Sequence, residues 1–185
     1  MVPVLMIDGV SKDGGYTTDV IACRYGKMAN IFSISKSGNI YADDINGDGI
    51  LEIPDTLNMW SNDGVGDGCY IVSWYSLTLS GRISCIETTY HNCYENWYLK
   101  LFGSLKEDVE IKYDEEINKT EFILDDEVVL TVDAVKIGSV YEDTGIKLGS
   151  WIDYAFYAKL SDNISENNVK SNFNIIMDEW QSEVE

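Results

Sequence analysis

The segment Val109-Glu110-Ile111-Lys112-Tyr113 places an apolar side chain at every second position and a charged one between them. This period of two is typical of a strand that buries one face and exposes the other. Apolar residues recur in the same way downstream, at Phe122, Leu124, Val128, Leu130 and Val132. The stretch therefore predicts a meander of half-buried strands, and it favours a β-rich fold.

Further strands are expected on both sides of this meander, separated by Gly, Asn and Asp residues. Residues 4–7, 17–24 and 28–33 predict three successive strands that lead into an acidic loop, as one propeller blade would. A hairpin is expected around Ser80-Gly81. Residues 96–102 are apolar on both faces, which predicts a central strand. Residues 154–160 predict one more strand.

Only the C-terminus has a helical pattern. Its apolar residues recur at spacings of three and four, and Ser165 is placed to cap the helix. This stripe predicts one amphipathic helix whose apolar side packs on a sheet: Val169, Phe173, Ile176, Trp180 and Val184.

The chain is strongly acidic: 32 Asp and Glu against 13 Lys and Arg give its 185 residues a formal charge of −19. This charge disfavours nucleic acid and anionic membranes as partners. No apolar stretch is long enough for a transmembrane segment. The first residues also lack the basic segment and cleavage site of a signal peptide, so an exported protein would carry its signal or anchor outside this chain.

One loop carries recognisable chemistry, Asp44-Ile45-Asn46-Gly47-Asp48-Gly49-Ile50-Leu51-Glu52. Ca²⁺ takes six to eight oxygen ligands, and side-chain oxygens at alternate positions supply them. We expect Asp44, Asn46 and Asp48 to bind through their side chains, Ile50 through its carbonyl, and Glu52 directly or through water. Asp48 is expected to matter more than Glu52, and Asp43 is expected to face solvent.

Two alternatives stay open for this loop. Asn-Gly and Asp-Gly pairs also form tight turns without a metal. Asp55 stands at the twelfth position, where a longer EF-type loop places its last carboxylate, although Pro54 disfavours the helix that would follow. A second ion near Asn62, Asp63 and Asp67 has a poorer spacing.

Catalytic motifs are absent from the sequence. His91 and Cys93 stand two residues apart, but neighbours on one strand seldom meet as a catalytic dyad. The four cysteines show no metal-ligand spacing, and a bridge between Cys85 and Cys93 is an open alternative. We therefore expect a non-enzymatic protein.

The loop, together with Val4-Leu5-Met6-Ile7-Asp8-Gly9 and Thr18-Asp19-Val20-Ile21, resembles the closing blade of FG-GAP/VCBS-repeat proteins of Gram-positive gut bacteria. Asn96-Trp97-Tyr98-Leu99-Lys100-Leu101-Phe102 resembles the small domain that follows such repeats. The resemblance implies export to the medium or cell surface, and calcium in an integrin-like blade.

The expected fold class is α+β and predominantly antiparallel β. Residues 1–60 would form propeller-blade-like strands with the calcium loop. Residues 61–185 would form a β-rich, α/β sandwich-like domain whose sheet carries one helix. The expected function is a calcium-binding, non-catalytic structural or adhesive module, with a surface glycan or protein as a further partner.

The alternative function is a carbohydrate-binding or accessory domain of an extracellular glycan-processing enzyme. Aromatic side chains that stack on sugar rings would carry it. The candidates are Trp60, Trp74, Tyr75, Tyr90, Tyr94, Trp97, Tyr98 and Trp151.

Overall fold

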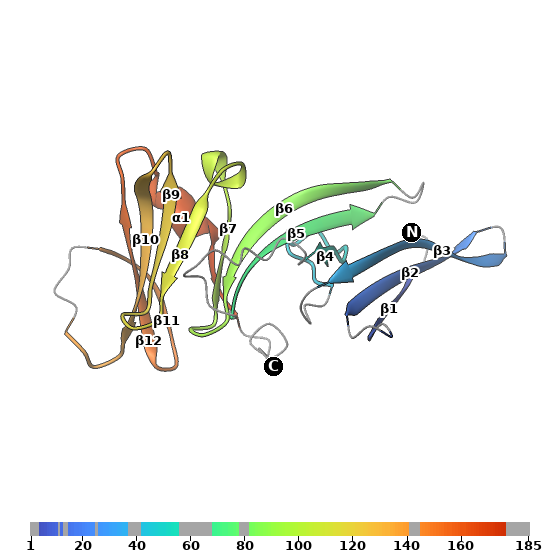
Figure 1. Cartoon of the computed structure of the whole chain (residues 1–185), viewed down its shortest axis with the longest axis horizontal. Coiled ribbons are helices and arrows are strands. Elements are labelled where there is room, and N and C mark those ends of the chain that lie inside the picture. The colour runs from blue at the N-terminus through green and yellow to red at the C-terminus, as the bar shows by residue number, and fades with distance from the viewer. Residues whose placement is uncertain are drawn as a thin grey trace. The chain divides into compact units, whose positions relative to one another are not determined.

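The computed structural model describes residues 4–10, 12, 15–24, 26–36, 42–55, 68–77, 82–140 and 145–176. The chain divides into two compact units, Met1–Met59 with Ile71–Thr88, and Trp60–Tyr70 with Thr89–Glu185. The described residues form three antiparallel sheets and one short α-helix (Figure 1). None of their helices is long and apolar enough to cross a membrane.

The first sheet lies in the first unit and has the strand order β1-β2-β3. It confirms the three strands expected near the N-terminus: β1 Val4–Val10, β2 Tyr16–Arg24 and β3 Lys27–Lys36. Val20, Ala22 and Thr18 alternate along β2 and are buried, so this sheet has one inner face. The register between β2 and β3 shifts at Val20/Ile21, which marks a bulge.

The second sheet has the order β13-β7-β6-β5-β4. Its strands are β4 Ile53–Asp55, β5 Cys69–Leu77, β6 Ile83–Asn92, β7 Trp97–Lys100 and β13 Phe173–Ile175. The central position expected for residues 96–102 is confirmed, because β7 has a neighbour on either side. Its apolar residues on one face, Trp97 and Leu99, are buried in the core.

The third sheet is the predicted meander, extended by a further hairpin, in the order β11-β12-β10-β9-β8. Its strands are β8 Glu110–Asp114, β9 Lys119–Leu124, β10 Glu127–Lys136, β11 Ile146–Trp151 and β12 Tyr154–Leu160. A 3-10 turn, Gly103–Lys106, precedes β8 and buries Leu105. The strand expected over residues 154–160 is confirmed as β12.

Aromatic rings fill the core of the second unit, between the third sheet and strands β6, β7 and β13. Tyr90 of β6 meets Phe122 of β9 edge-to-face, with 5.5 Å between ring centroids. Phe156 of β12 lies 5.4 Å from Phe173 of β13, which also stacks on Trp97. The Tyr90–Phe122 and Phe156–Phe173 pairs cross from one sheet to the other, so the two sheets share one apolar layer.

The helical expectation was too long. Helix α1 covers only Glu166–Asn172, with Ser165 at its N-cap position but no side-chain capping hydrogen bond. Phe173 then starts β13, which pairs with β7 at Leu99 and Trp97. Strand pairing across the sheet therefore overrides the helical period after Asn172. Trp180 and Val184 lie outside the described residues.

The propeller-blade expectation holds only at a coarser level. The N-terminal strands do form one antiparallel sheet, but the described residues form no propeller and no closed sheet. The four cysteines all lie in described segments, and none of them is in a disulfide. The bridge considered between Cys85 and Cys93 is therefore not formed.

Candidate metal centre

The acidic loop is closed at its base by a backbone bridge between Asp43 and Glu52. The Glu52 amide donates to the Asp43 carbonyl at 2.8 Å, and the Asp43 amide donates to the Glu52 carbonyl at 3.2 Å. Ile45 and Ile53, one on each side of the loop, are buried at 3% and 0% exposure. These two apolar side chains anchor the loop to the first unit while its tip stays in solvent.

Side-chain oxygens fix the conformation of the loop by accepting hydrogen bonds from its backbone amides. Asp44 accepts from the Asp48 and Gly49 amides at 2.9 and 2.7 Å, through its two carboxylate oxygens. Asn46 accepts from the Asp48 amide at 2.8 Å, and Asp48 accepts from the Ile50 amide at 2.8 Å. The alternation of oxygen-bearing residues thus folds the loop into successive Asx turns.

Two glycines are required by the backbone of this loop. Gly47 and Gly49 have φ of +79° and +83°, a conformation that residues with a Cβ adopt at a cost. Apart from the glycine itself and its two chain neighbours, no heavy atom of the described residues lies within 4 Å of the position that a Cβ would take at Gly47 or Gly49. Glycine is therefore favoured at these two positions by the backbone conformation and not by a lack of space for a side chain.

Glu52 is the exceptional member of the loop, because its side chain is fully buried, at 0% exposure. No side chain in the described segments donates a hydrogen bond to its carboxylate. Burial raises the pKa of Glu52, and the nearby charges of Asp48, Asp44 and Asp43 raise it further, while a backbone hydrogen bond from Ile45 lowers it. A buried carboxylate with so few donors and no cation is costly.

Asp43 departs from its expectation. It is half-buried, and its carboxylate accepts from the Asp44 amide at 2.9 Å. Its charge acts on Glu52. The sequence could not predict this role for Asp43, because the role depends on the backbone bridge between Asp43 and Glu52.

The side chains of the loop suit Ca²⁺, because every atom that they offer as a metal ligand is a hard oxygen. No group of three His, Cys, Asp or Glu side chains in the described part of the chain is arranged as a metal site. The oxygens of Asp44 and Asp48 face backbone amides instead. A carboxylate has about four lone-pair sites, so each retains acceptor capacity for a cation beside its amide. The calcium site therefore remains a prediction.

The other predicted ligands lie where the loop geometry puts them. Asn46, Asp48 and Ile50 are exposed at the tip, and Ile50 is 51% exposed. Asp55 lies beyond the bridge, in strand β4, where it pairs with Ser73. Residues 53–55 are therefore extended, as Pro54 predicted, and no helix begins there. Asn62, Asp63 and Asp67 lie outside the described residues.

His91 and Cys93 are both buried in the second unit. The His91 Nε2 lies 2.7 Å from the Thr89 hydroxyl, and its ring stacks on Tyr98. Burial lowers the pKa of His91 to about 3 and raises the pKa of the Cys93 thiol to about 12. Both shifts oppose the histidine-activated thiolate that a nucleophilic cysteine requires.

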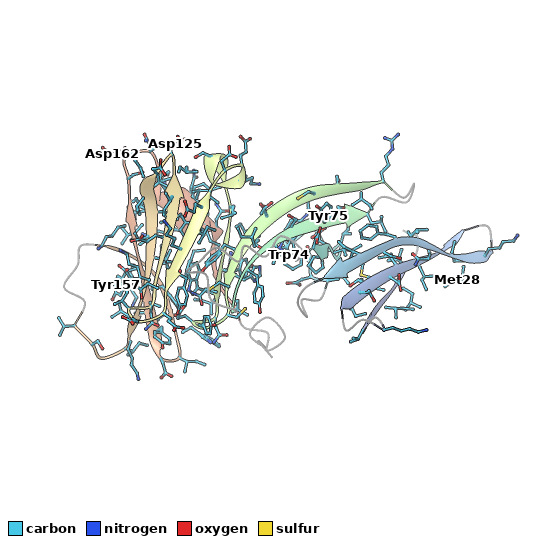
Figure 2. The ribbon with its side chains drawn as sticks, in the orientation of Figure 1. Met28, Trp74, Tyr75, Asp125, Tyr157 and Asp162 are labelled. Atoms are coloured by element: carbon cyan, nitrogen blue, oxygen red, sulfur yellow. The ribbon has the colours of Figure 1, made fainter. Side chains whose placement is uncertain are left out.

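The aromatic residues considered as a sugar platform are divided between core and surface. Trp74, Tyr90 and Trp97 are buried at 0 to 1% exposure, so these three candidates of the alternative function belong to the core. Figure 2 shows Trp74 beside the half-buried Tyr75 on β5. Tyr98 and Trp151 are half-buried, Tyr94 is 44% exposed, and Trp60 lies outside the described residues.

A further carboxylate of the second unit was not singled out from the sequence. Glu95 is 3% exposed and accepts a short hydrogen bond from the Tyr113 hydroxyl. Burial raises its pKa, and the hydrogen bond from the Tyr113 hydroxyl opposes the rise. This carboxylate therefore has a side-chain donor, which Glu52 lacks in the described segments.

Comparisons of the chain with protein-family models, with curated proteins and with solved structures find no match.

Proposed function

We propose that the chain is a calcium-stabilised, non-catalytic structural or adhesive module of a secreted or cell-surface bacterial protein. Asp44, Asn46, Asp48 and Glu52 would bind the ion through side-chain oxygens, and Ile50 through its carbonyl. The ion would supply positive charge to a loop that holds only negative charges.

The buried Glu52 carboxylate is the observation that carries this proposal. No side chain in the described segments donates a hydrogen bond to it, its one donor is the Ile45 backbone amide, and three further carboxylates raise its pKa. A turn that needed no metal would gain nothing from this group, because Gln or an apolar residue would avoid the cost of the buried charge. With a bound cation the buried charge becomes favourable, since the cation offsets the repulsion among all four acids.

The export and adhesion parts of the proposal rest on the resemblance to FG-GAP/VCBS-repeat proteins. The high negative charge of the chain agrees with solubility and with cation binding. The alternative, a carbohydrate-binding or accessory domain, retains Tyr94 as its exposed aromatic side chain. A glycan array read with and without calcium separates the two: binding of defined glycans, lost in Tyr94→Ala, would favour the alternative.

The metal proposal is tested by melting curves in chelator, in calcium and in magnesium. Extracellular sites bind calcium with a Kd of about 10⁻⁴ to 10⁻³ M, so about 1 mM calcium should stabilise the fold by about 0.4 to 1.4 kcal/mol. Magnesium should stabilise it less, because it demands a tighter octahedral shell. Asp48→Ala should abolish the response, and Asp162→Asn, an exposed acid of the second unit, should retain it (Figure 2). Identical curves in calcium and chelator would exclude the proposal.

A further inference from the structure

Strand β1 has the composition of a central strand but lies at the edge of its sheet (Figure 1). Its register with β2 places Val4 opposite Ala22 on the inner face, and Leu5 opposite Ile21 on the outer face. Apolar residues thus occupy both of its faces. They are also unusually exposed for their type: Val4 43%, Leu5 51%, Ile7 44% and Val10 65%.

The opposite edge strand, β3, is protected in the ways that edges of natural sheets usually are. It carries the bulge, it begins with Lys27, and Asn30 and Ser33 form hydrogen bonds to Asp19 beside them. The pairing of β1 with β2 is regular over its whole length. An exposed, regular and apolar edge strand is a template for another strand, because only an extended backbone matches its row of amide and carbonyl groups.

Charge also distinguishes this sheet from the rest of the chain. Residues 1–36 contain three acids and four bases, a formal charge of +1: Asp8, Asp13, Asp19, Lys12, Arg24, Lys27 and Lys36. The total charge is −19, so the remaining residues carry −20. Two copies of the chain would repel each other along most of their surfaces, but not at this sheet.

We propose that β1 is a self-association strand, which pairs antiparallel with β1 of a second copy. A two-fold axis through Ile7 sets this register. It places Ile7 opposite Ile7 of the second copy, Val4 opposite Val10 and Leu5 opposite Gly9. Asp8, the one charged residue of β1, falls opposite Met6, so no like charges oppose each other.

The carboxylate of Asp8 also accepts a hydrogen bond from the Thr18 hydroxyl of β2. It is therefore already engaged within its own sheet. The pairing joins two three-stranded sheets into one continuous sheet and removes both β1 edges. It does not involve the acidic loop, so it stands independently of the calcium proposal.

Sedimentation velocity over a micromolar to millimolar concentration range tests the pairing in the unmodified chain. A monomer–dimer equilibrium is expected. Ile7→Lys places two like charges at the axis and should raise the dimer dissociation constant at least about tenfold. Met28→Lys, on the other edge strand, is the matched control, because Met28 is 62% exposed (Figure 2). Its dissociation constant should be unchanged.

A cross-linking measurement decides the register and does not depend on the lysine variant folding. Cys23 and Cys85 are exposed and are first changed to Ser. Ile7→Cys in this background should form a disulfide dimer under an oxidised thiol buffer, whereas Met28→Cys should remain monomeric. A chain that stays monomeric at every concentration would overturn the proposal. So would equal weakening by both lysine variants, or equal cross-linking at both positions.

Discussion

Replacing Glu52 by Gln keeps the shape of the side chain and removes its charge. In chelator at neutral pH the variant should be more stable than the unmodified protein. Removing one of four neighbouring carboxylates relieves repulsion of about 1 to 4 kcal/mol for a close pair, as the effective dielectric constant falls from that of water to about 20. Glu52 is fully buried and no side chain in the described segments donates to it, and a Gln oxygen can still accept a hydrogen bond from the Ile45 amide, so the substitution need break no hydrogen bond there.

In about 1 mM calcium the stability advantage of Glu52→Gln should be smaller than in chelator. The unmodified protein gains about 0.4 to 1.4 kcal/mol from the ion, whereas Glu52→Gln should gain little, because an amide is a weaker ligand than a carboxylate. The advantage of the variant should therefore shrink or disappear. For a chain of this size, 1 kcal/mol corresponds to about 2 to 4 °C in Tm.

Urea denaturation in chelator and in calcium measures both effects as free energies of unfolding. Glu127→Gln, which changes an exposed carboxylate of β10, is the matched control and should respond to calcium like the unmodified protein. The reasoning fails if Glu52→Gln is less stable than the unmodified protein in chelator and retains the full calcium response. That result would mean that hydrogen bonds from the protein stabilise the Glu52 charge and that Glu52 does not serve the ion.

Other expectations follow from the second unit. His91 has a pKa of about 3 in the folded chain, against an ordinary value of 6.5, so it contributes stability that is present above pH 6.5 and lost as pH falls toward 3. Between pH 7 and pH 5 the unmodified protein should lose about 2 kcal/mol relative to His91→Gln, as measured by urea denaturation; parallel pH profiles would contradict this. Tyr113→Phe leaves the buried Glu95 without its hydroxyl donor and should lower the free energy of unfolding by about 1.5 to 3 kcal/mol. The loss should be smaller when Glu95→Gln is already present, and additive losses would show that the two residues are not coupled. A Cβ at Gly68 would lie 2.7 Å from the ring of Tyr94, so Gly68→Ala should cost about 1 to 3 kcal/mol and be partly rescued by Tyr94→Ala; no rescue would place the strain elsewhere.

The strands were the predictable part of the fold. A period of two reports which face of a strand is buried, and this local property identified β8, β9 and β10 from apolar spacing alone. Strand β13 was missed because Phe173 belongs to a helical period in the sequence. Its pairing with Leu99 depends on a strand more than 70 residues away, which no local pattern encodes.

In the candidate site, too, the local features could be predicted from the sequence and the tertiary features could not. The positions of Asp44, Asn46 and Asp48 around the glycines could be predicted, because Asx turns and positive φ are local properties. The burial of Glu52 could not, since glutamate is seldom buried and the ninth loop position often reaches an ion only through water. Its burial arises from the bridge to Asp43 and from the anchored Ile53, which are tertiary features. The structure therefore gives Glu52 more weight relative to Asp48 than the sequence did.

Isothermal titration calorimetry of the unmodified chain with calcium is the most direct measurement of the central claim. The account predicts one site per chain, with a Kd of about 10⁻⁴ to 10⁻³ M and weaker binding of magnesium. Asp48→Ala and Glu52→Gln should each abolish the binding heat, and Glu127→Gln should leave it unchanged. The absence of a saturable calcium signal from the folded, unmodified chain at millimolar calcium would contradict the account.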